Sequence, residues 1–298
     1  MLAIALRSLA MALVATMLAL VKYAGDLAIS LPEVMFWRQA VTVPMLLGWL
    51  WWSGALARLR TMRMGSHGAR AAIGTAGMLC HFTAAMLLPL PEATVFGFTA
   101  PLYAVLIAAF ILRDHVGRWR WTAVAIGFAG VLLIAQPGGH YIPPLGLVAG
   151  IGSGIFVAVV NFLIRDITRT DTTEAVVFYF GVYGTLIAAL FLPFYATGHS
   201  LLEWSVLIAI SIVGTLSQLL LTVSLRYAPV ITVIVIDYTS LIWTIGFGWA
   251  IWDHLPPWTT WFGAPLIVAA GLVIAWRQHK LARPLSEPAI TGGGQQGT

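Results

Sequence analysis

Long apolar runs fill almost the whole chain, and polar residues gather in the short gaps between them. A helix needs roughly 20 apolar residues to cross the hydrocarbon core of a bilayer, and ten runs approach or exceed that length. The runs cover residues 2–22, 33–54, 70–90, 92–112, 119–137, 144–164, 173–195, 202–225, 228–252 and 257–276. The pattern predicts an all-α integral membrane protein with ten transmembrane helices, joined by loops too short to hold a catalytic domain.

Composition agrees with this prediction and narrows the class of protein. Hydrophobic residues make up 60% of the chain and charged residues 9%, whereas soluble domains carry about 25% charged residues. The net charge of +5 would suit a nucleic-acid partner, but no basic run is long enough to follow a phosphate backbone. Cys80 is the only cysteine, which excludes an intramolecular disulfide and a multi-cysteine metal site. We therefore expect the lipid bilayer as a partner, and no nucleic acid, metal or cofactor.

Basic residues are distributed unevenly between the gaps. All of the 16 Lys and Arg residues except Lys22 and Arg38 lie near the two ends of the chain or in alternate gaps. Because positively charged loops stay in the cytoplasm, both termini are expected on that side. The polar segment 281–298 is rich in Gly and Gln and is expected to form a disordered cytoplasmic tail.

Two stretches far apart in the chain carry the same residues in the same order. The first contains Pro91, Thr94, Val95, Asp114, His115, Trp119, Trp121, Ala129 and Gly130. The second contains Pro229, Thr232, Val233, Asp253, His254, Trp258, Trp261, Ala270 and Gly271. Each stretch covers the fourth and fifth helices of a five-helix unit, and because five is odd the second unit enters the membrane from the opposite face. The sequence therefore predicts two inverted repeats, residues 1–138 and 139–280, with a transport site near mid-membrane where they meet.

The same features carry a resemblance to a known family. The run Phe36-Trp37-Arg38 opens the second helix, and Pro91 and Pro229 open the fourth and ninth helices. Asp114 follows the end of the fourth helix and Asp253 that of the ninth, and the next helix of each half ends in a Gly-rich segment, 130–134 or 271–274. The chain resembles the drug/metabolite transporter superfamily in its EamA-type branch, where the closing acid is commonly Glu rather than Asp. It looks most similar to bacterial exporters of aromatic and neutral amino acids. The resemblance implies a ten-helix transporter in the inner membrane of a bacterium.

We place three ionisable residues within the membrane, namely Arg38, His81 and Asp237, and the others at or near the ends of the runs. A charge at the bilayer centre costs at least ~2.5–3.5 kcal/mol on insertion scales, so each is a functional candidate. Asp237 and His81 are expected near mid-depth. Asp237 would bind a substrate ammonium group or carry a proton, or else join helices by hydrogen bonds. His81 would bind a substrate carboxylate or change charge near neutral pH, or else be a satisfied core histidine.

Arg38 is expected nearer the external side of the second helix. The favoured interpretation is a structural or gating ion pair with Glu33, and the alternative is direct binding of a carboxylate, which the planar guanidinium suits.

Uncharged polar and aromatic residues complete the candidate site. Ser211, Thr215, Gln218 and Thr222 repeat at helical spacing and form a polar stripe, which must face protein or water inside a bilayer. It would line the transport path or hold helices together. The substrate-binding candidates are His81, Asp237, Gln218, Phe98, Thr99, Tyr103, Asn161, Tyr179, Tyr183 and Tyr238. Gly146, Gly150 and Gly154 form a small-residue ridge, which is typical of helix packing.

The sequence thus predicts a secondary transporter that exports small metabolites, most of all amino acids, by alternating access through a central cavity. A Walker phosphate loop is absent from the sequence, so ATP is not the expected energy source. One alternative is an exporter of drugs or cationic compounds, and a more distant one is an intramembrane enzyme using His81 and Asp237. The chain is not expected to be an enzyme, because it lacks a paired metal motif and a recognisable nucleophile motif. The sequence leaves the oligomeric state open, and it is compatible with a monomer.

Overall fold

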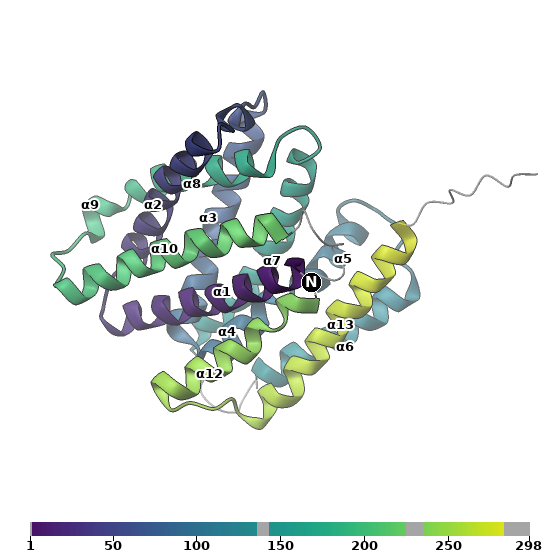
Figure 1. The fold of residues 1–298 in the computed structure, drawn as a ribbon. Coiled ribbons are helices and arrows are strands. Elements are labelled where there is room, and N and C mark those ends of the chain that lie inside the picture. Colours follow the sequence, from purple (N-terminus) through teal and green to yellow (C-terminus); the bar gives the residue numbers. More distant parts are fainter. Residues whose placement is uncertain (1, 136–142, 225–234, 283–298) are drawn as a thin grey trace, which may run out of the picture.

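The computed structural model describes residues 2–135, 143–224 and 235–282, and every regular element in these ranges is a helix (Figure 1). The helices are α1 (Leu2–Asp26), α2 (Leu31–Trp52), the 3-10 turn η1 (Leu56–Leu59), α3 (Met64–Leu87), α4 (Leu90–Gly97), α5 (Ala100–Phe110), α6 (Arg118–Ala135), α7 (Pro144–Ile167), α8 (Thr173–Ala189), α9 (Leu192–Tyr195), α10 (Leu201–Ser224), α12 (Ser240–Trp252) and α13 (Trp258–Ala282). The predicted all-α class is confirmed for these residues.

Six described segments are long and apolar enough to cross a membrane by length and composition. They are Ile4–Asp26, Leu90–Phe110, Arg118–Ala135, Pro144–Ile167, Leu201–Leu221 and Trp258–Arg277. Each overlaps a run that the hydropathy pattern singles out. The helices α2, α3, α8 and α12 correspond to the other four runs, although the first part of run 228–252, with Pro229, lies outside the described residues.

The fourth run forms two helices rather than one. The helix α4 ends at Gly97, and α5 begins at Ala100 with Pro101 in its first turn. Proline lacks the N–H that would continue a helix, and its ring displaces the preceding turn. At the break, Phe96 O accepts from both Thr99 N at 3.2 Å and the Thr99 hydroxyl at 2.5 Å. A comparable break at Tyr238 and Thr239 precedes α12, so both runs that open the repeated stretches are interrupted.

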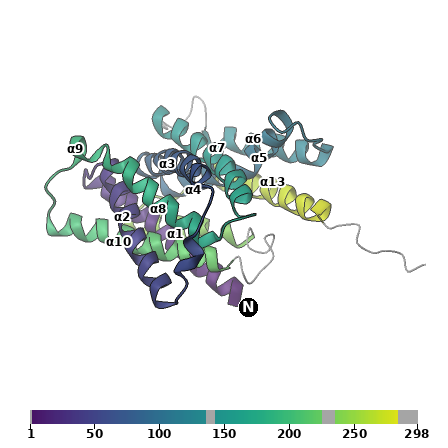
Figure 2. The same ribbon diagram turned by 90° about the horizontal axis from the view of Figure 1, so that it is seen from above.

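The helices pack in pairs that join the two halves of the chain. The most extensive pairs are α6 with α13, α3 with α7, α1 with α10, and α2 with α8. In Figures 1 and 2, α6 and α13 lie side by side at one edge of the molecule, and α2 and α8 lie toward the other. The α6–α13 backbones meet at glycines: a Cβ on Gly130 would lie 2.7 Å from Gly263 O, and one on Gly263 would lie 2.8 Å from Gly130 O.

These pairs keep their pattern when the halves are exchanged. If α1, α2, α3, α4–α5 and α6 are matched in order with α7, α8, α10, α12 and α13, then α1–α10 corresponds to α7–α3. In the same way α2–α10 corresponds to α8–α3, and α1–α12 to α7 against α4 and α5. The pairs α2–α8, α4–α12 and α6–α13 correspond to themselves. Two homologous halves facing each other would pack in this way.

The glycine ridge of α7 is used for packing, as predicted. A Cβ on Gly146 would meet Leu88 at 2.8 Å, and one on Gly150 would meet Phe96 at 2.7 Å. Gly154 is in contact with Thr99 and Tyr103. The ridge therefore lets the broken fourth segment lie directly against α7.

Candidate functional site

Buried polar atoms without a hydrogen-bond partner are concentrated on α3. Among the described residues they are His67 Nδ1, Arg70 Nε and Nη1, Thr75 Oγ1, His81 Nδ1 and Glu92 Oε2. All but the last belong to α3. Buried polar groups in folded proteins are nearly always partnered, and each exception needs an explanation such as a bound ligand or water. This helix is therefore the natural place to look for the transport path.

Arg70 is the residue that the sequence interpretation missed. It lies in the second turn of α3 and is 6% exposed. Its guanidinium carbon stands 3.8 Å from the centre of the Phe180 ring, and Gly74 leaves the space that its Nη1 occupies. The sequence pattern places Arg70 with the cytoplasmic loop bases, because the apolar run begins at residue 70. The helix begins six residues earlier, at Met64, which carries Arg70 into the bundle.

Arg38 lies deep between α1, α2 and α3. Its Nη1 donates to Gln39 Oε1 at 3.0 Å and approaches the Met78 sulfur at 3.2 Å, and its Nε faces the Met17 sulfur at 3.5 Å. The Gln39 amide in turn donates to Phe180 O at 3.4 Å. Gln39 and Phe180 therefore connect the two arginines. The expected Arg38–Glu33 ion pair is not formed in the described structure, because Glu33 is bound elsewhere.

His81 and two predicted aromatic residues meet at the break of the fourth segment. A Cβ on Gly97 would lie 3.4 Å from His81 Cε1, so the imidazole faces the end of α4. The next residue, Phe98, packs edge-to-face on Tyr238 with ring centroids 4.8 Å apart. The breaks before α5 and α12 therefore touch, and His81 lies beside them. Thr99 and Tyr103 point to the α7 ridge, where they are packing residues.

Asp237 is engaged by Arg7. The Arg7 Nε and Nη2 donate to the two carboxylate oxygens at 2.5 and 2.7 Å, a bidentate geometry that gives strong ion pairs. Arg7 also donates to Leu221 O at 3.2 Å and Ser224 Oγ at 3.3 Å. Through Arg7, Asp237 therefore lies level with the first turns of α1 and the last turn of α10.

The remaining candidates have varied surroundings. On α10, Thr215 shares a 2.9 Å hydrogen bond with Thr42 of α2, so this part of the stripe joins helices. Gln218 is partly buried on the same helix, and the side chain of Thr222 lies outside the described part. Asn161 is exposed on α7. Tyr179 and Tyr183 lie away from His81, next to the loops described below.

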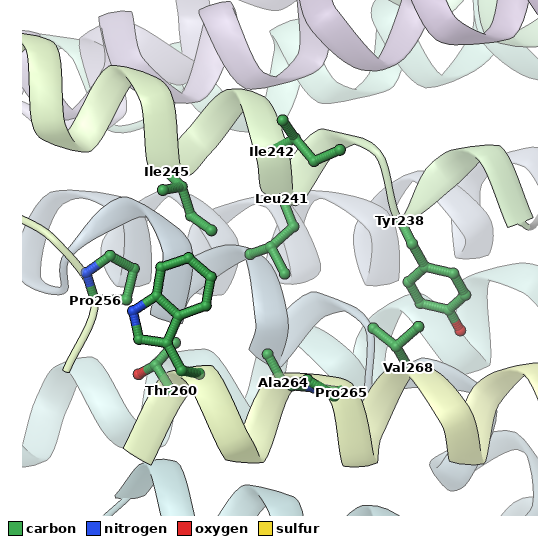
Figure 3. A pocket seen from close by; sticks show the side chains of 10 residues that line it. Tyr238, Leu241, Ile242, Ile245, Pro256, Thr260, Ala264, Pro265 and Val268 are labelled. Atoms are coloured by element: carbon green, nitrogen blue, oxygen red, sulfur yellow. The ribbon is translucent and has the colours of Figure 1, made fainter. Parts of the chain in front are cut away.

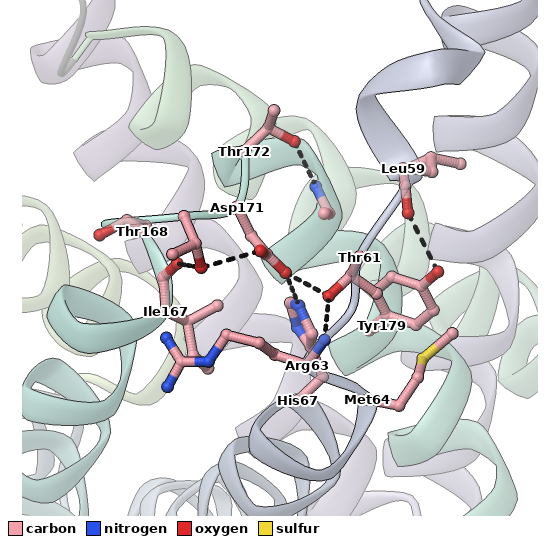
Figure 4. A network of polar contacts seen from close by, with 12 residues as sticks. Leu59, Thr61, Arg63, Met64, His67, Ile167, Thr168, Asp171, Thr172 and Tyr179 are labelled. Atoms are coloured by element: carbon pink, nitrogen blue, oxygen red, sulfur yellow. Dashed lines mark hydrogen bonds and ion pairs between the residues drawn. The ribbon is translucent and has the colours of Figure 1, made fainter.

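A polar network joins the α2–α3 loop to the α7–α8 loop (Figure 4). We call it the Asp171 network: Arg58, Thr61, His67, Asp171 and Glu174. His67 Nε2 lies 2.7 Å from Asp171 Oδ2, Thr61 donates to the same carboxylate, and Arg58 donates to Glu174 at 2.9 Å. Nearby, the Tyr179 hydroxyl donates to Leu59 O at 3.0 Å, and the Tyr183 hydroxyl lies 3.9 Å from the Met64 sulfur.

The hydrogen bonds around Asp171 also set its acidity. Burial of the carboxyl raises its pKa, but hydrogen bonds from Thr61, His67 and Thr170 outweigh burial and hold the pKa below its ordinary value. Asp171 is thus a stable anion that ties the two loops together at neutral pH.

A second network joins the α1–α2 turn to the segment before α10. We call it the Glu33 network: Ser30, Glu33, Thr197, His199 and Glu203. Glu33 Oε1 accepts from Thr197 N at 2.9 Å and lies 2.9 Å from His199 Nε2. Ser30 caps α2 in a reciprocal capping box with Glu33, and His199 Nδ1 lies 3.2 Å from Glu203.

The two networks lie at opposite ends of α2. Glu33 is in the first turn of this 22-residue helix and Arg58 follows its last, and a helix of that length spans about 33 Å. When the two halves are exchanged, the α2–α3 loop corresponds to the α8–α10 connection. In the same way, the α7–α8 loop corresponds to the α1–α2 connection. Each network is therefore the counterpart of the other, with a histidine–carboxylate contact at its centre.

A groove of about 340 Å³ opens between α12 and α13 (Figure 3). Apolar side chains line most of it, with Leu241 and Ile245 pointing from α12 toward Ala264 of α13. Tyr238 lies at one end, and its ring continues inward to Phe98. One end of the groove is therefore formed by Tyr238, a member of the aromatic pair beside His81.

Comparison with known proteins supports a transport role. The model of the EamA-like transporter family matches residues 1–136 and 144–276. The pseudopaline exporter CntI of Pseudomonas aeruginosa is 28% identical over 82% of this chain and 85% of its own length. A transporter of Helicobacter pylori is 33% identical over 69% of this chain and 72% of its own. The riboflavin transporter of Vibrio cholerae is 25% identical, over 83% of each chain.

A solved structure extends the likeness to the fold. A crystal structure titled only as that of a protein aligns with a TM-score of 0.63 at 21% identity, covering 94% of this chain and 98% of the other. At 21% identity, this alignment shows similarity of the fold and not of the function. With the family model matching nearly the whole chain in two segments, this multi-pass membrane protein belongs to the EamA-like transporter family.

Proposed function

We propose that this transporter exports small metabolites, with amino acids as the main class, by alternating access between its two halves. The observation that carries the proposal is the pair of exchange-related networks at the two ends of α2. Each joins a loop of the first half to a loop of the second, so each end of the bundle can be held shut by contacts that a relative movement of the halves would break. Export is also the activity named for the Pseudomonas aeruginosa relative.

In the proposed architecture, the substrate passes between two related halves of the chain. Residues 1–138 and 139–280 would form inverted five-helix repeats, supported by the exchange-symmetric helix pairs and by the separate segments that match the family model. The substrate would pass between the repeats near α3, Phe98 and Tyr238. The distribution of basic residues supports a bacterial inner-membrane protein with both termini in the cytoplasm.

In the proposed cycle, opening one network is coupled to closing the other. Packed interfaces switch between discrete arrangements rather than deforming continuously, and the glycine contacts between α6 and α13 provide a surface on which the halves can rock. The substrate would bind while one end is open and leave after the other has opened.

Counterflow in proteoliposomes tests this function. Vesicles containing the full chain are loaded with an unlabelled amino acid, and entry of the same labelled amino acid is followed across a panel of neutral, aromatic and acidic members. We expect accumulation above that of protein-free vesicles for at least one member. Exchange limited to bulky organic cations would favour a drug exporter, and no exchange of any amino acid would contradict the proposed class.

A further inference from the structure

The centre of the bundle contains positive charge without a matching acid. Arg38 and Arg70 each lie inside the helix bundle and are linked through Gln39 and Phe180: Arg38 donates to Gln39, the Gln39 amide donates to Phe180 O, and the Phe180 ring lies against the Arg70 guanidinium. His81 lies on the same helix as Arg70, and its Nδ1 is buried without a partner. Among the described residues, no carboxylate lies within ion-pair distance of any of the three. Two sulfur atoms, one amide and two aromatic rings are the neighbours that the arginines have instead.

The acids that could neutralise this charge are engaged elsewhere. Glu33 and Asp171 contact histidines, Asp166, Glu174 and Asp237 bind arginines, and Glu92 accepts from Thr260 at 2.8 Å. These contacts lie at the ends of helices or between other helix pairs. The fold therefore keeps the two central arginines apart from its own acids.

Unpaired charges of this kind are expensive. An arginine at the centre of a bilayer costs at least ~2.5–3.5 kcal/mol on insertion scales, and such residues almost always pair or mark a substrate pathway. Two Arg70 nitrogens, Nε and Nη1, are buried without a hydrogen-bond partner, and the Phe180 ring, 3.8 Å from the guanidinium carbon, offers no oxygen that could accept from them. A carboxylate is the ligand that fits the edge of a guanidinium, because its two oxygens match two parallel N–H donors.

We propose that Arg38 and Arg70, positioned by Gln39 and Phe180, bind the carboxylate of the transported molecule, and that this transporter takes organic anions in preference to neutral or cationic compounds. This inference rests on the proposed function and names the charge class of its substrate. His81, whose Nδ1 is buried and unpartnered, lies farther along α3 and would meet a second polar group of the same substrate. The aromatic pair Phe98 and Tyr238 then bounds the site.

The first test measures binding without transport. The full chain is purified in detergent, and its melting temperature is followed with succinate, glutamate, succinamide and leucine. We expect succinate and glutamate to raise the melting temperature and succinamide to leave it unchanged. Arg70→Gln and Arg38→Gln should weaken the anion response about tenfold or more, which is the loss of a charge-assisted hydrogen bond. The matched control is Arg118→Gln, exposed at the start of α6, which should respond as the unmodified protein does.

A second pair of variants keeps the test decisive if a glutamine variant fails to fold. Arg70→Lys retains the charge but loses the planar fork, so it should bind anions more weakly and still prefer them. Arg38→Met removes a half-buried charge that has no carboxylate partner among the described residues, and with it the cost of desolvating that charge. It should therefore keep or raise the melting temperature without ligand while losing the anion response.

The outcomes separate this inference from the function on which it rests. Counterflow of leucine that equals or exceeds that of glutamate and is unchanged in Arg70→Gln would overturn the anion preference while leaving transport intact. An equal shift with succinate and succinamide would overturn it as well. A specific succinate shift in a protein without counterflow would support the anion site and contradict the proposed transport of amino acids.

Discussion

The two ends of the bundle are closed by the same central contact in different surroundings. At one end, His67 meets Asp171, and two Arg–carboxylate pairs, Arg58–Glu174 and Arg63–Asp166, reinforce it. At the other end, His199 stands between Glu33 and Glu203, and no arginine takes part in the described region. The difference teaches that the Asp171 end is held by more charge-assisted bonds, so the Glu33 end should open more readily.

Removing Asp171 should have the largest effect. Asp171→Ala leaves Thr61 and the buried His67 without their shared acceptor, and we expect a loss of about 3 kcal/mol in the free energy of unfolding. Labelling of a cysteine placed at Ile167, which is buried at this end, in a Cys80→Ala background, should become faster. Unchanged labelling and an unchanged melting temperature would show that the network does not hold this end shut.

Glu33→Gln should be the next largest change. The amide can keep part of the capping box but loses charge-assisted bonds to Thr197 and His199, so a loss of about 1–2 kcal/mol is expected. Labelling should increase at the Glu33 end and decrease at the Asp171 end. The matched control is Glu203→Gln, whose carboxylate lies farther from His199, at 3.2 Å against 2.9 Å for Glu33. A larger effect for Glu203→Gln would reverse the assignment of the central carboxylate.

Acidification should weaken the Asp171 end by a smaller amount. Because the pKa of folded Asp171 is lowered, its stabilising contribution is complete above the ordinary aspartate pKa of about 3.9 and is lost as the pH falls through the lower folded value. As the pH is lowered from neutral toward the folded pKa of Asp171, the melting temperature should therefore fall more steeply for the unmodified protein than for Asp171→Asn. Parallel curves would contradict the shifted pKa.

Arg63→Gln should have the smallest effect of the series. Arg63 and Asp166 have side-chain exposures of 31% and 54%, and exposed ion pairs contribute only about 0–1 kcal/mol. The melting temperature and transport rate should stay close to those of the unmodified protein. A loss as large as that of Asp171→Ala would mean that this outer pair, not the buried histidine contact, closes the end.

Most of the fold follows from local sequence signals, whereas the site depends on contacts between distant segments. The apolar runs predicted the positions of the helices, because a helix that crosses a bilayer must be both long and hydrophobic. The spacing of the glycines on α7 predicted its packing ridge. Pro101 is the sequence signal for the break before α5. A hydropathy average over about 20 residues does not detect a single proline. Arg70 was missed because a base at the edge of an apolar run looks like a loop residue.

The partners of charged residues were the hardest part to predict. Asp237 pairs with Arg7 across 230 positions of the chain, and no local spacing announces such a contact. Glu33 was assigned to Arg38 because the two are close in sequence, yet five residues on a helix separate their side chains by more than one turn, and His199 of the other half lies closer. Only the packing of the halves decides these pairs, which is why the networks were absent from the sequence interpretation.

The most direct test of alternating closure measures both ends in one protein. In a Cys80→Ala background, spin labels are placed at Met62 and Thr168 at the Asp171 end, and in a second variant at Ala28 and Gly198 at the Glu33 end; all four positions are exposed. Pulsed electron paramagnetic resonance then gives the distance across each end with and without a transported anion. Because both networks are formed in this structure, alternating access predicts that one distance lengthens while the other stays short. Distances that stay fixed or lengthen together would contradict it.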